Sequence, residues 1–332
     1  MSFSRFEKRL PVCLLHRTLP DDAEDAKIVR VTLVHNAGAG DDDQPDGEAL
    51  QRLVRKAGHE VRYQSCSEDT WHAVLDEPAD VVAVAGGDGT VGRVAKKLIG
   101  RDVPLAPLPF GTANNISKTL RLTELTLPEI VSGWDLGRRM TFDVGVANGP
   151  WGSRYFVEAM GTGLFACTIP VADRNRTLAT LTDADAKVAY ALQMLRQRLA
   201  DCPPHTLELR IDGEDHSGEY VLFEAMNMEF VGPNLYLAPD IAPTDGMLDV
   251  ILVTTAERDK LNESLATWQR GDLAHPDLRR VRAREIDMRW GGFEVHFDDE
   301  PWPAGNDEPP ALAPIELRVE HAALSFLAPA PG

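Results

Sequence analysis

The chain has 332 residues, of which 43 % are hydrophobic and 26 % are charged. These fractions are typical of a folded globular protein and exclude a disordered chain, and the length suits two domains. The 52 acidic residues outnumber the 34 basic residues, which gives a formal net charge of −18. A negative field of this size opposes nonspecific binding to nucleic acid and electrostatic docking on anionic membranes. We therefore expect no nucleic-acid partner.

Cysteine content and hydropathy limit the location of the protein. The four cysteines lie far apart without a CxxC motif, so we expect neither a disulfide framework nor a structural zinc site, and we predict a cytoplasmic location. No apolar run approaches the length of about 18 residues that spans a bilayer. Any membrane contact is therefore expected to be peripheral and transient. Two groups of basic residues, within 174–198 and 279–289, could face lipid headgroups, although a solvated charged surface also explains them.

The first half of the chain alternates between strand and helix patterns. Residues 1–27 are predicted to be an N-terminal extension. Beyond them, β-branched and apolar runs predict strands at 29–34, 60–64, 81–85 and 103–108. The spacing of apolar residues predicts helices at 47–57, 69–75, 91–100 and 113–120. This alternation predicts an α/β nucleotide-binding domain with a parallel sheet over residues 28–138.

Strand patterns prevail after about residue 140, with one helix predicted at 184–200. The expected strands are 140–147, 153–160, 206–211, 219–226, 248–254, 284–290, 292–297 and 315–319. Many strands with little helix predict a mainly antiparallel β-sandwich over residues 139–321, which would be the substrate domain. The tail, 322–332, could pack back on the first domain.

Two small-residue loops stand at the carboxyl ends of predicted strands, where ligands bind in parallel α/β sheets. The first, Gly86-Gly87-Asp88-Gly89-Thr90, lets backbone N–H groups approach a phosphate at the start of a helix, and its aspartate could hold Mg²⁺ or orient the loop. In the second, Gly111-Thr112-Ala113-Asn114, the threonine could contact a phosphate or cap the next helix. A capped turn explains either loop alone, but both together favour a nucleotide site. The loops are neither a Walker A motif nor a Rossmann fingerprint.

The order GGDGT then GTANN resembles the diacylglycerol-kinase catalytic domain of bacterial lipid kinases, which are related to the sphingosine and ceramide kinases. Residues 237–250 and 297–302 are similar to two further motifs of that family, so that the resemblance covers about residues 28–330. It implies an ATP-dependent lipid kinase that transfers the γ-phosphate to the hydroxyl of a diacylglycerol-like or sphingoid lipid. Mg²⁺ would bridge the phosphates.

The resemblance also implies roles for individual residues. Glu300 would be the general base, and Asp298 and Asp88 would be catalytic carboxylates that support it or contact the metal. Asp245 and the carbonyls of Ala242 and Met247 would hold a second Mg²⁺ or Ca²⁺, although a turn stabilised by an aspartate also explains this segment. The implied nucleotide contacts are Asn36, Gln64, Gly86, Gly87, Asp88, Gly89, Thr90, Val91, Gly92, Gly111, Thr112 and Asn114.

Three residues depart from the family pattern. Ala37 stands where the first loop has proline, Asn115 replaces the aspartate of GTxND, and Asp299 replaces the glycine of the D-G-E turn. We expect Asp299 to adopt a backbone conformation that favours glycine, and its charge to raise the pKa of a neighbouring carboxyl. Two alternatives stay open: an NAD kinase, which shares GGDG, and a catalytically silent nucleotide- or lipid-binding regulator. The GTANN loop and the D-G-E-like turn argue against the NAD kinase. The acceptor lipid and the oligomeric state have no signal in the sequence.

Overall fold

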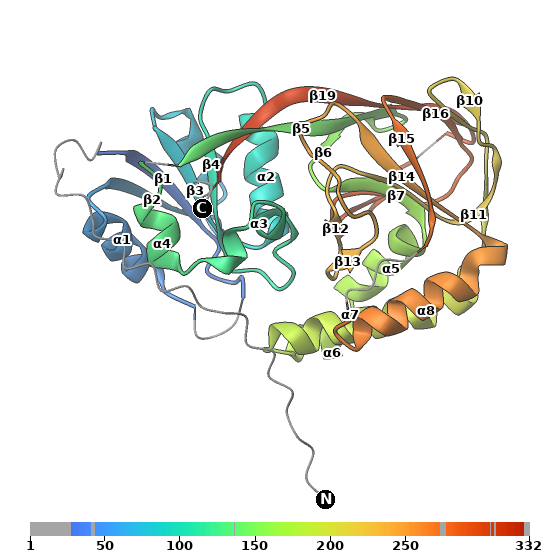
Figure 1. Ribbon diagram of the computed structural model, residues 1–332, viewed down its shortest axis with the longest axis horizontal. Helices are drawn as coiled ribbons and strands as arrows, with labels where there is room; N and C mark the ends of the chain where they lie inside the picture. Colours follow the sequence, from blue (N-terminus) through green and yellow to red (C-terminus); the bar gives the residue numbers. More distant parts are fainter. Residues whose placement is uncertain are drawn as a thin grey trace, which may run out of the picture.

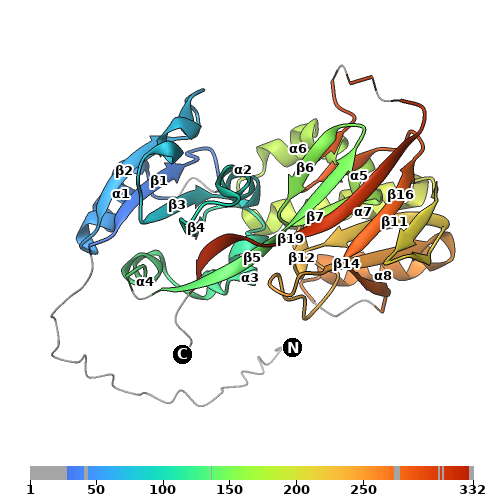
Figure 2. The same cartoon turned by 90° about the horizontal axis from the view of Figure 1, so that it is seen from above.

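The computed structural model describes residues 28–40, 44–135, 137–272, 277–305, 307–308 and 310–328. The predicted N-terminal extension lies outside these residues. Figures 1 and 2 show two lobes, with the long strands β5 (Arg138–Gly149) and β19 (Ala313–Ala328) running from one to the other.

The first lobe is the predicted α/β layer. Its strands are parallel, in the order β2-β1-β3-β4. Their bounds are β1 (Arg30–His35), β2 (Glu60–Ser65), β3 (Val81–Gly86) and β4 (Leu105–Pro109). The helices are α1 (Gly47–Lys56), α2 (Asp88–Leu98), α3 (Asn115–Thr119) and α4 (Leu127–Ser132), with 3₁₀ turns η1 (Trp71–Asp76) and η2 (Leu122–Glu124). Every residue of β3 is buried, as its wholly apolar sequence predicts for a central parallel strand.

The second lobe is the predicted β-sandwich, with mainly antiparallel pairing. One sheet has the order β15-β14-β11-β7-β17-β18, with β8 beside β11, and the other contains β10-β9-β16-β19 with β5 and β6. The bounds are β6 (Gly152–Phe156), β7 (Ala159–Gly163), β8 (His205–Leu207), β9 (Leu209–Ile211), β10 (Glu214–Asp215), β11 (Gly218–Met226), β14 (Leu248–Thr254), β15 (Arg279–Ala283), β16 (Glu285–Trp290), β17 (Val295–Phe297) and β18 (Glu300–Trp302). A small hairpin, β12 (Phe230–Val231) and β13 (Leu235–Tyr236), stands apart.

The expectation of one helix in this half is wrong. Besides α7 (Ala184–Asp201), the second lobe contains α5 (Leu164–Asp173), α6 (Arg176–Thr180) and α8 (Arg258–Gln269). Helix α5 is apolar on most sides, so it lacks the polar face that gives a surface helix its periodic pattern. Helix α8 does carry the pattern, because Leu261, Leu265 and Trp268 are its buried residues.

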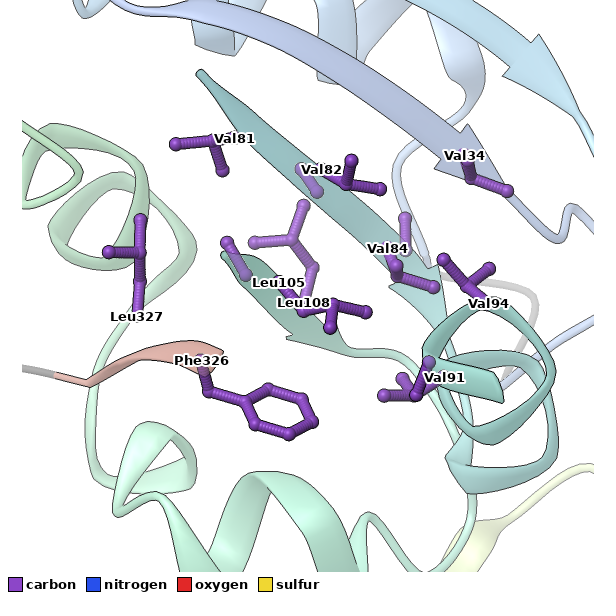
Figure 3. Packing of buried hydrophobic residues seen from close by; sticks show 14 of the residues in the cluster. Val34, Val81, Val82, Val84, Val91, Val94, Leu105, Leu108, Phe326 and Leu327 are labelled. Carbon is purple, nitrogen blue, oxygen red and sulfur yellow. The ribbon is translucent and has the colours of Figure 1, made fainter. Parts of the chain in front are cut away.

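The C-terminal strand completes the core of the first lobe. Strand β19 runs antiparallel to β5, and near its end Phe326 pairs in parallel register with Leu105 of β4. Figure 3 shows the Phe326 ring beside Leu108 and the helix α2 residue Val91. The Phe326 side chain is fully buried, so this lobe depends on a segment more than 200 residues from its last sequential strand.

The part of the chain that the structure describes has no helix long and apolar enough to cross a membrane. The basic group within 279–289 is largely engaged with acids of the same chain. Arg280 Nε lies 2.5 Å from Asp249 Oδ1, and Arg289 Nη1 lies 3.5 Å from Glu208 Oε2. These pairings favour the interpretation of this group as a solvated charged surface over a headgroup-binding patch.

We predict that Phe326→Ala will lower the free energy of unfolding by about 3–5 kcal/mol, the usual cost of removing a fully buried phenylalanine. Urea unfolding of the full chain measures the change. Leu312→Ala is the control, because Leu312 is 60 % exposed and its removal should have little effect. Equal losses in the two variants would contradict the role of β19 in the core.

Candidate active site

The two glycine-rich loops touch each other. Gly87 precedes helix α2, and Gly111 follows strand β4. A Cβ added to Gly111 would lie 2.3 Å from the Cα of Gly87, and one added to Gly87 would lie 2.9 Å from the Cα of Gly111. Only glycine at both positions allows this approach. The loops therefore form one continuous floor at the carboxyl ends of β3 and β4.

A polar cavity of about 350 Å³ lies over this floor. Six of the predicted nucleotide contacts line it: Asn36, Gly87, Gly89, Thr90, Gly111 and Thr112. The Asn36 side chain donates to Thr90 Oγ1 over 2.9 Å, which ties the loop after β1 to the start of α2. Arg93, which the sequence analysis missed, and Lys187, which it counted in the basic group within 174–198, also line the cavity. A helix N-terminus, glycine backbone and two cations make a site suited to an anion such as phosphate.

The other predicted nucleotide contacts lie away from this cavity. Val91 and Gly92 are buried in α2, and Gly86 is buried under the loop. Asn114 accepts a hydrogen bond from Gly111 N over 2.8 Å and donates one to Gly111 O over 2.7 Å, so its side chain shapes the second loop. The Gln64 side chain donates to Ser65 O at the end of β2. None of these five residues lines the cavity: Gly86, Val91, Gly92, Asn114 and Gln64 support its walls or lie outside it.

The Asp88 side chain links the two loops through a hydrogen bond. Its Oδ1 accepts a hydrogen bond from Ile116 N over 2.9 Å, which links the first turns of α2 and α3. Burial raises the pKa of this carboxyl, while the backbone hydrogen bonds and Lys118 oppose the rise. Asp88 lines a second cavity, to which Arg93 does not contribute.

This second cavity is mostly apolar and has a volume of about 220 Å³. Its apolar wall comes from α5, α7 and the β12–β13 hairpin: Phe165, Ile169, Met194, Leu195, Val231 and Leu235. Its polar end comes from Asp88, Asn115, Glu158, His296, Asp298 and Asp299. An apolar chamber with a few convergent polar groups is typical of a site for an amphipathic small molecule.

Asn115 and Glu158 form the innermost part of the polar end. Asn115 Nδ2 donates to Glu158 Oε2 over 3.0 Å and to the Gly232 carbonyl over 2.9 Å. The Asn115 Oδ1 atom is buried and has no protein partner among the described residues, so it can accept a hydrogen bond from a ligand. Burial and the nearby Asp88 charge raise the pKa of Glu158 well above its usual value. Glu158, whose partners are distant in sequence, was missed by the sequence analysis.

The turn between β17 and β18, with the first residue of β18, carries three acids in a row, Asp298, Asp299 and Glu300. Asp298 Oδ1 accepts hydrogen bonds from Val157 N over 2.9 Å and Glu158 N over 2.8 Å, while Oδ2 lies 2.9 Å from Lys96 Nζ. Burial alone would lower the pKa of Lys96, but Asp298 and Glu300 raise it above its ordinary value. Lys96, on α2, was also missed. The Asp298 carboxylate is thus fixed by both lobes.

The expectation of a glycine-like backbone at Asp299 is wrong. The positive φ of this turn, 56°, falls on Asp298, and aspartate is among the residues that tolerate this region. Position 299 therefore accepts a side chain without left-handed strain. Glu300 pairs with Phe297 in the hairpin. Its side chain is 50 % exposed, with Oε1 lying 3.6 Å from Lys96 Nζ.

A buried histidine–glutamate pair supports the same turn. His296 Nε2 lies 3.1 Å from the Glu224 carboxylate, and His296 Nδ1 lies 2.8 Å from the Asp298 carbonyl oxygen. Burial alone would lower the pKa of His296, but Glu224 and the carbonyl raise it. A Cβ at Gly161 would lie 2.0 Å from Glu224 Oε2, so a glycine at 161 is required for this pair.

The residues predicted for a second metal ion are engaged by other groups. The Asp245 carboxylate contacts the Arg282 guanidinium and accepts a hydrogen bond from Met247 N over 3.0 Å. The Ala242 carbonyl accepts from Asp245 N over 3.3 Å. With the cation of Arg282 on its only carboxylate, this set does not fit a divalent ion. No step of the reaction is assigned to such an ion.

Two family models match the chain. The diacylglycerol kinase catalytic domain model matches residues 30–147, and the model of the YegS C-terminal NAD kinase beta sandwich-like domain matches residues 166–328. The diacylglycerol kinase of Mycobacterium tuberculosis is 28% identical over 264 residues, which cover 75% of this chain and 80% of that protein. The probable lipid kinase YegS of Escherichia coli is 26% identical, over 80% of this chain and 87% of its own.

Solved structures share the fold at low identity. A diacylglycerol kinase of Bacillus anthracis superposes with a TM-score of 0.68 and 21% identity, covering 92% of this chain and 98% of that chain. Yeast NADH kinase complexed with NADH superposes with a TM-score of 0.52 and 10% identity, covering 92% of this chain and 85% of that chain.

These comparisons define a two-lobed kinase in which an α/β lobe is joined to an NAD-kinase-like β-sandwich. Within this class, the chain belongs to the diacylglycerol kinase catalytic domain family. The fold class, the family resemblance and the prediction of a lipid kinase are thereby confirmed, and membership of a kinase family implies the use of ATP.

We predict that Lys96→Met will lower the free energy of unfolding by about 3 kcal/mol. This is the lower end of the range for a broken buried ion pair, because Asp298 keeps its backbone N–H donors. Chemical unfolding measures the loss, and Lys97→Met, on an exposed position of the same helix, is the matched control. Equal stability of the two variants would show that Lys96 does not fix the turn.

Proposed function

We propose that the protein is an ATP-dependent lipid kinase that transfers the γ-phosphate of ATP to the hydroxyl of a diacylglycerol-like or sphingoid lipid. The observation that supports this most strongly is the meeting of two unlike cavities. Gly89 and Asp299 line both the polar cavity over the glycine loops and the apolar cavity beside them. A phosphate donor in one and a lipid alcohol in the other would meet at these residues.

The glycine loops would hold the phosphates. Glycine at 87 and 111 leaves no side chain between the two loops, and Arg93 and Lys187 offer positive charge in the cavity above them. Asp88 and the acidic turn at 298–300 could bind Mg²⁺, which supplies charge neutralisation at the phosphates when it is bound. We assign the region 28–138 to the nucleotide and the region 139–321 mainly to the lipid, with β5 and β19 shared.

Phosphoryl transfer needs the two reactants held in line and the negative charge on the phosphates neutralised. The acceptor hydroxyl loses its proton to a carboxylate, its oxygen forms a bond to the γ-phosphorus, and the bond from that phosphorus to the β–γ bridging oxygen breaks, which releases ADP. The acidic turn at 298–300 supplies the carboxylate, a role for which Glu300 is the residue implied by the family resemblance. Asn115 Oδ1 and Glu158 provide hydrogen-bonding groups for the polar part of the lipid.

The lipid would enter from a membrane surface during a peripheral and transient contact of a cytoplasmic protein. The apolar wall of the second cavity suits acyl or sphingoid chains, and the net charge of −18 opposes lasting attachment to anionic bilayers. The NAD kinase alternative draws support from the shared GGDG motif and from a shared fold. The silent-regulator alternative draws on the departures at 115 and 299.

One assay separates these functions. Purified full chain is incubated with γ-labelled ATP and Mg²⁺, in parallel with dioctanoylglycerol, sphingosine and NAD. We expect labelled lipid and no labelled NADP. Asp88→Ala should abolish transfer, because it removes a carboxylate at the polar end of the apolar cavity and the link between α2 and α3.

Asp102→Ala is the matched control, since this aspartate is 97 % exposed and pairs only with Arg139 among the described contacts; it should keep wild-type transfer. Labelled NADP alone would establish the NAD kinase. ATP binding without transfer to any acceptor would establish the silent regulator. Full transfer by a folded Asp88→Ala variant would contradict the assignment of the loop.

A further inference from the structure

We infer that Cys167 and Cys202 are a redox-sensitive pair, which hydrogen peroxide converts to a disulfide that slows entry of the lipid. Formation of the disulfide is independent of the proposed function, whereas its effect on the lipid rests on that function. Both cysteines are free thiols in the structure. Neither of them lines the polar cavity or the apolar cavity.

The two thiols touch each other across two helices. Cys167 belongs to α5, and Cys202 caps the C-terminal end of α7, with their sulfur atoms 3.4 Å apart. Both pack in the apolar core that α5 and α7 share (Figure 1). The sulfur–sulfur bond of a disulfide is about 2.05 Å long, so that a small approach of one helix to the other joins the pair.

The surroundings of Cys167 favour its oxidation. Its side chain is partly exposed, whereas Cys202 is 1 % exposed. The side chain of Arg198 lies beside Cys167, and its Nε atom is buried without a hydrogen-bond partner among the described residues. The hydrogen bond with Cys202 and the Arg198 charge lower the pKa of the Cys167 thiol, and the same contact raises the pKa of Cys202.

These properties give each cysteine its part in the reaction. A thiolate is the form of cysteine that attacks a peroxide, and accessible cysteines beside a cation are the reactive ones. Cys167 is therefore the residue that meets the oxidant. Cys202, which is buried against it, is the resolving thiol that completes the disulfide.

The oxidation takes two steps. The Cys167 thiolate attacks one peroxide oxygen, so that a sulfur–oxygen bond forms, the oxygen–oxygen bond breaks, and the departing hydroxide takes a proton to become water. The sulfur has then given two electrons to the peroxide and is a sulfenic acid. The Cys202 sulfur attacks it, the sulfur–oxygen bond breaks, and hydroxide leaves as water with the Cys202 proton. Two thiols and one peroxide thus give one disulfide and two waters.

The pair stands beside the wall of the apolar cavity. Thr168 and Ile169, which follow Cys167 on α5, line that cavity, and so do Met194 and Leu195 of α7. Its volume of about 220 Å³ is below the range of about 300–1,000 Å³ that is usual for drug-sized ligands. A two-chain lipid therefore requires α5 and α7 to move apart within the second lobe. A disulfide between these helices opposes that movement, so we expect the oxidised protein to admit the lipid less readily.

The first part of the test is to locate the disulfide. The reduced full chain is exposed to hydrogen peroxide, the remaining thiols are alkylated, and the peptides are identified by mass spectrometry. We expect a linked pair of peptides that contain Cys167 and Cys202, which a dithiol reductant separates by exchange. Cys66→Ser is the matched control and should form the same link, because Cys66 lies beyond β2 in the first lobe and burial raises the pKa of its thiol.

The second part measures lipid phosphorylation on the same samples, with ATP, Mg²⁺ and either dioctanoylglycerol or sphingosine in detergent micelles. Peroxide should lower kcat/KM for the lipid by at least about fivefold, the lower end of typical coupling between sites, and the dithiol should restore it. ATP affinity, measured by calorimetry, should stay unchanged, because both glycine loops lie in the first lobe.

Two variants show whether the pair causes the loss. Cys167→Ser and Cys202→Ala should each keep the reduced wild-type rate, since neither side chain lines a cavity, and each should be insensitive to peroxide. Cys202 is buried, so if thermal unfolding shows that Cys202→Ala does not fold, the partly exposed Cys167→Ser decides the question.

Three results would overturn the inference. The first is oxidation of Cys167 beyond the sulfenic acid with no link to Cys202, which leaves a cysteine without a resolving partner. The second is a complete link with an unchanged lipid rate. The third is an equal loss of rate in Cys167→Ser and wild type, which assigns the loss to another residue. Failure of the proposed function would be distinct, since the reduced wild-type protein would then phosphorylate neither lipid.

Discussion

The ion pair between Lys96 and Asp298 determines how the two halves of the site meet. Lys96 belongs to α2, whose first turn is part of the first glycine-rich loop, and Asp298 belongs to the turn that lines the apolar cavity. The pair is largely buried, and the backbone N–H groups of Val157 and Glu158 hold Asp298 from the other side. Such a pair contributes little net stability compared with apolar packing. Its main effect is on position, because it holds the acidic turn at 298–300 against helix α2 and the first glycine-rich loop.

The strands β5 and β19, which both lobes share, hold the two lobes in place relative to each other. Their antiparallel ladder runs from the Glu316–Asn148 pair to the Ala328–Arg138 pair, through a register shift between Glu320 and Leu324. Because β19 also pairs with β4, rotation of one lobe against the other would break backbone hydrogen bonds in a buried sheet. The site is therefore largely preformed, and a lipid would reach it through the mouth of the cavity.

Local patterns predicted the first lobe well, because its strands and loops are defined by neighbours in sequence. The wholly buried β3 and the contact of Gly87 with Gly111 both follow from short apolar and glycine-rich stretches. Helix α5 could not be recognised in the same way, since an apolar helix has no contrasting face.

The candidate site was predicted less completely than the fold. Six of the predicted nucleotide contacts line the polar cavity, and their role in binding stays a prediction. Lys96 and Glu158 were missed, and Lys187 was assigned only to a basic surface group, because each lies beside partners that are distant along the chain. The conformation at 299 was misjudged for a related reason: which residue of a two-residue turn takes the positive φ depends on the hairpin register, and here Asp298 does.

The departures at 115 and 299 are best understood together. Asparagine at 115 removes a negative charge next to Glu158, and aspartate at 299 adds one near the same group, since both Asp88 and Asp299 raise the pKa of Glu158. An aspartate at 115 would place another carboxylate against buried Glu158 and Asp88, where like charges are costly. The exchange keeps the number of acids while moving one from beside Glu158 to position 299, which lines both cavities. At 299 the charge lies where the polar and apolar cavities meet, whereas at 115 it would lie against the buried Glu158 carboxyl.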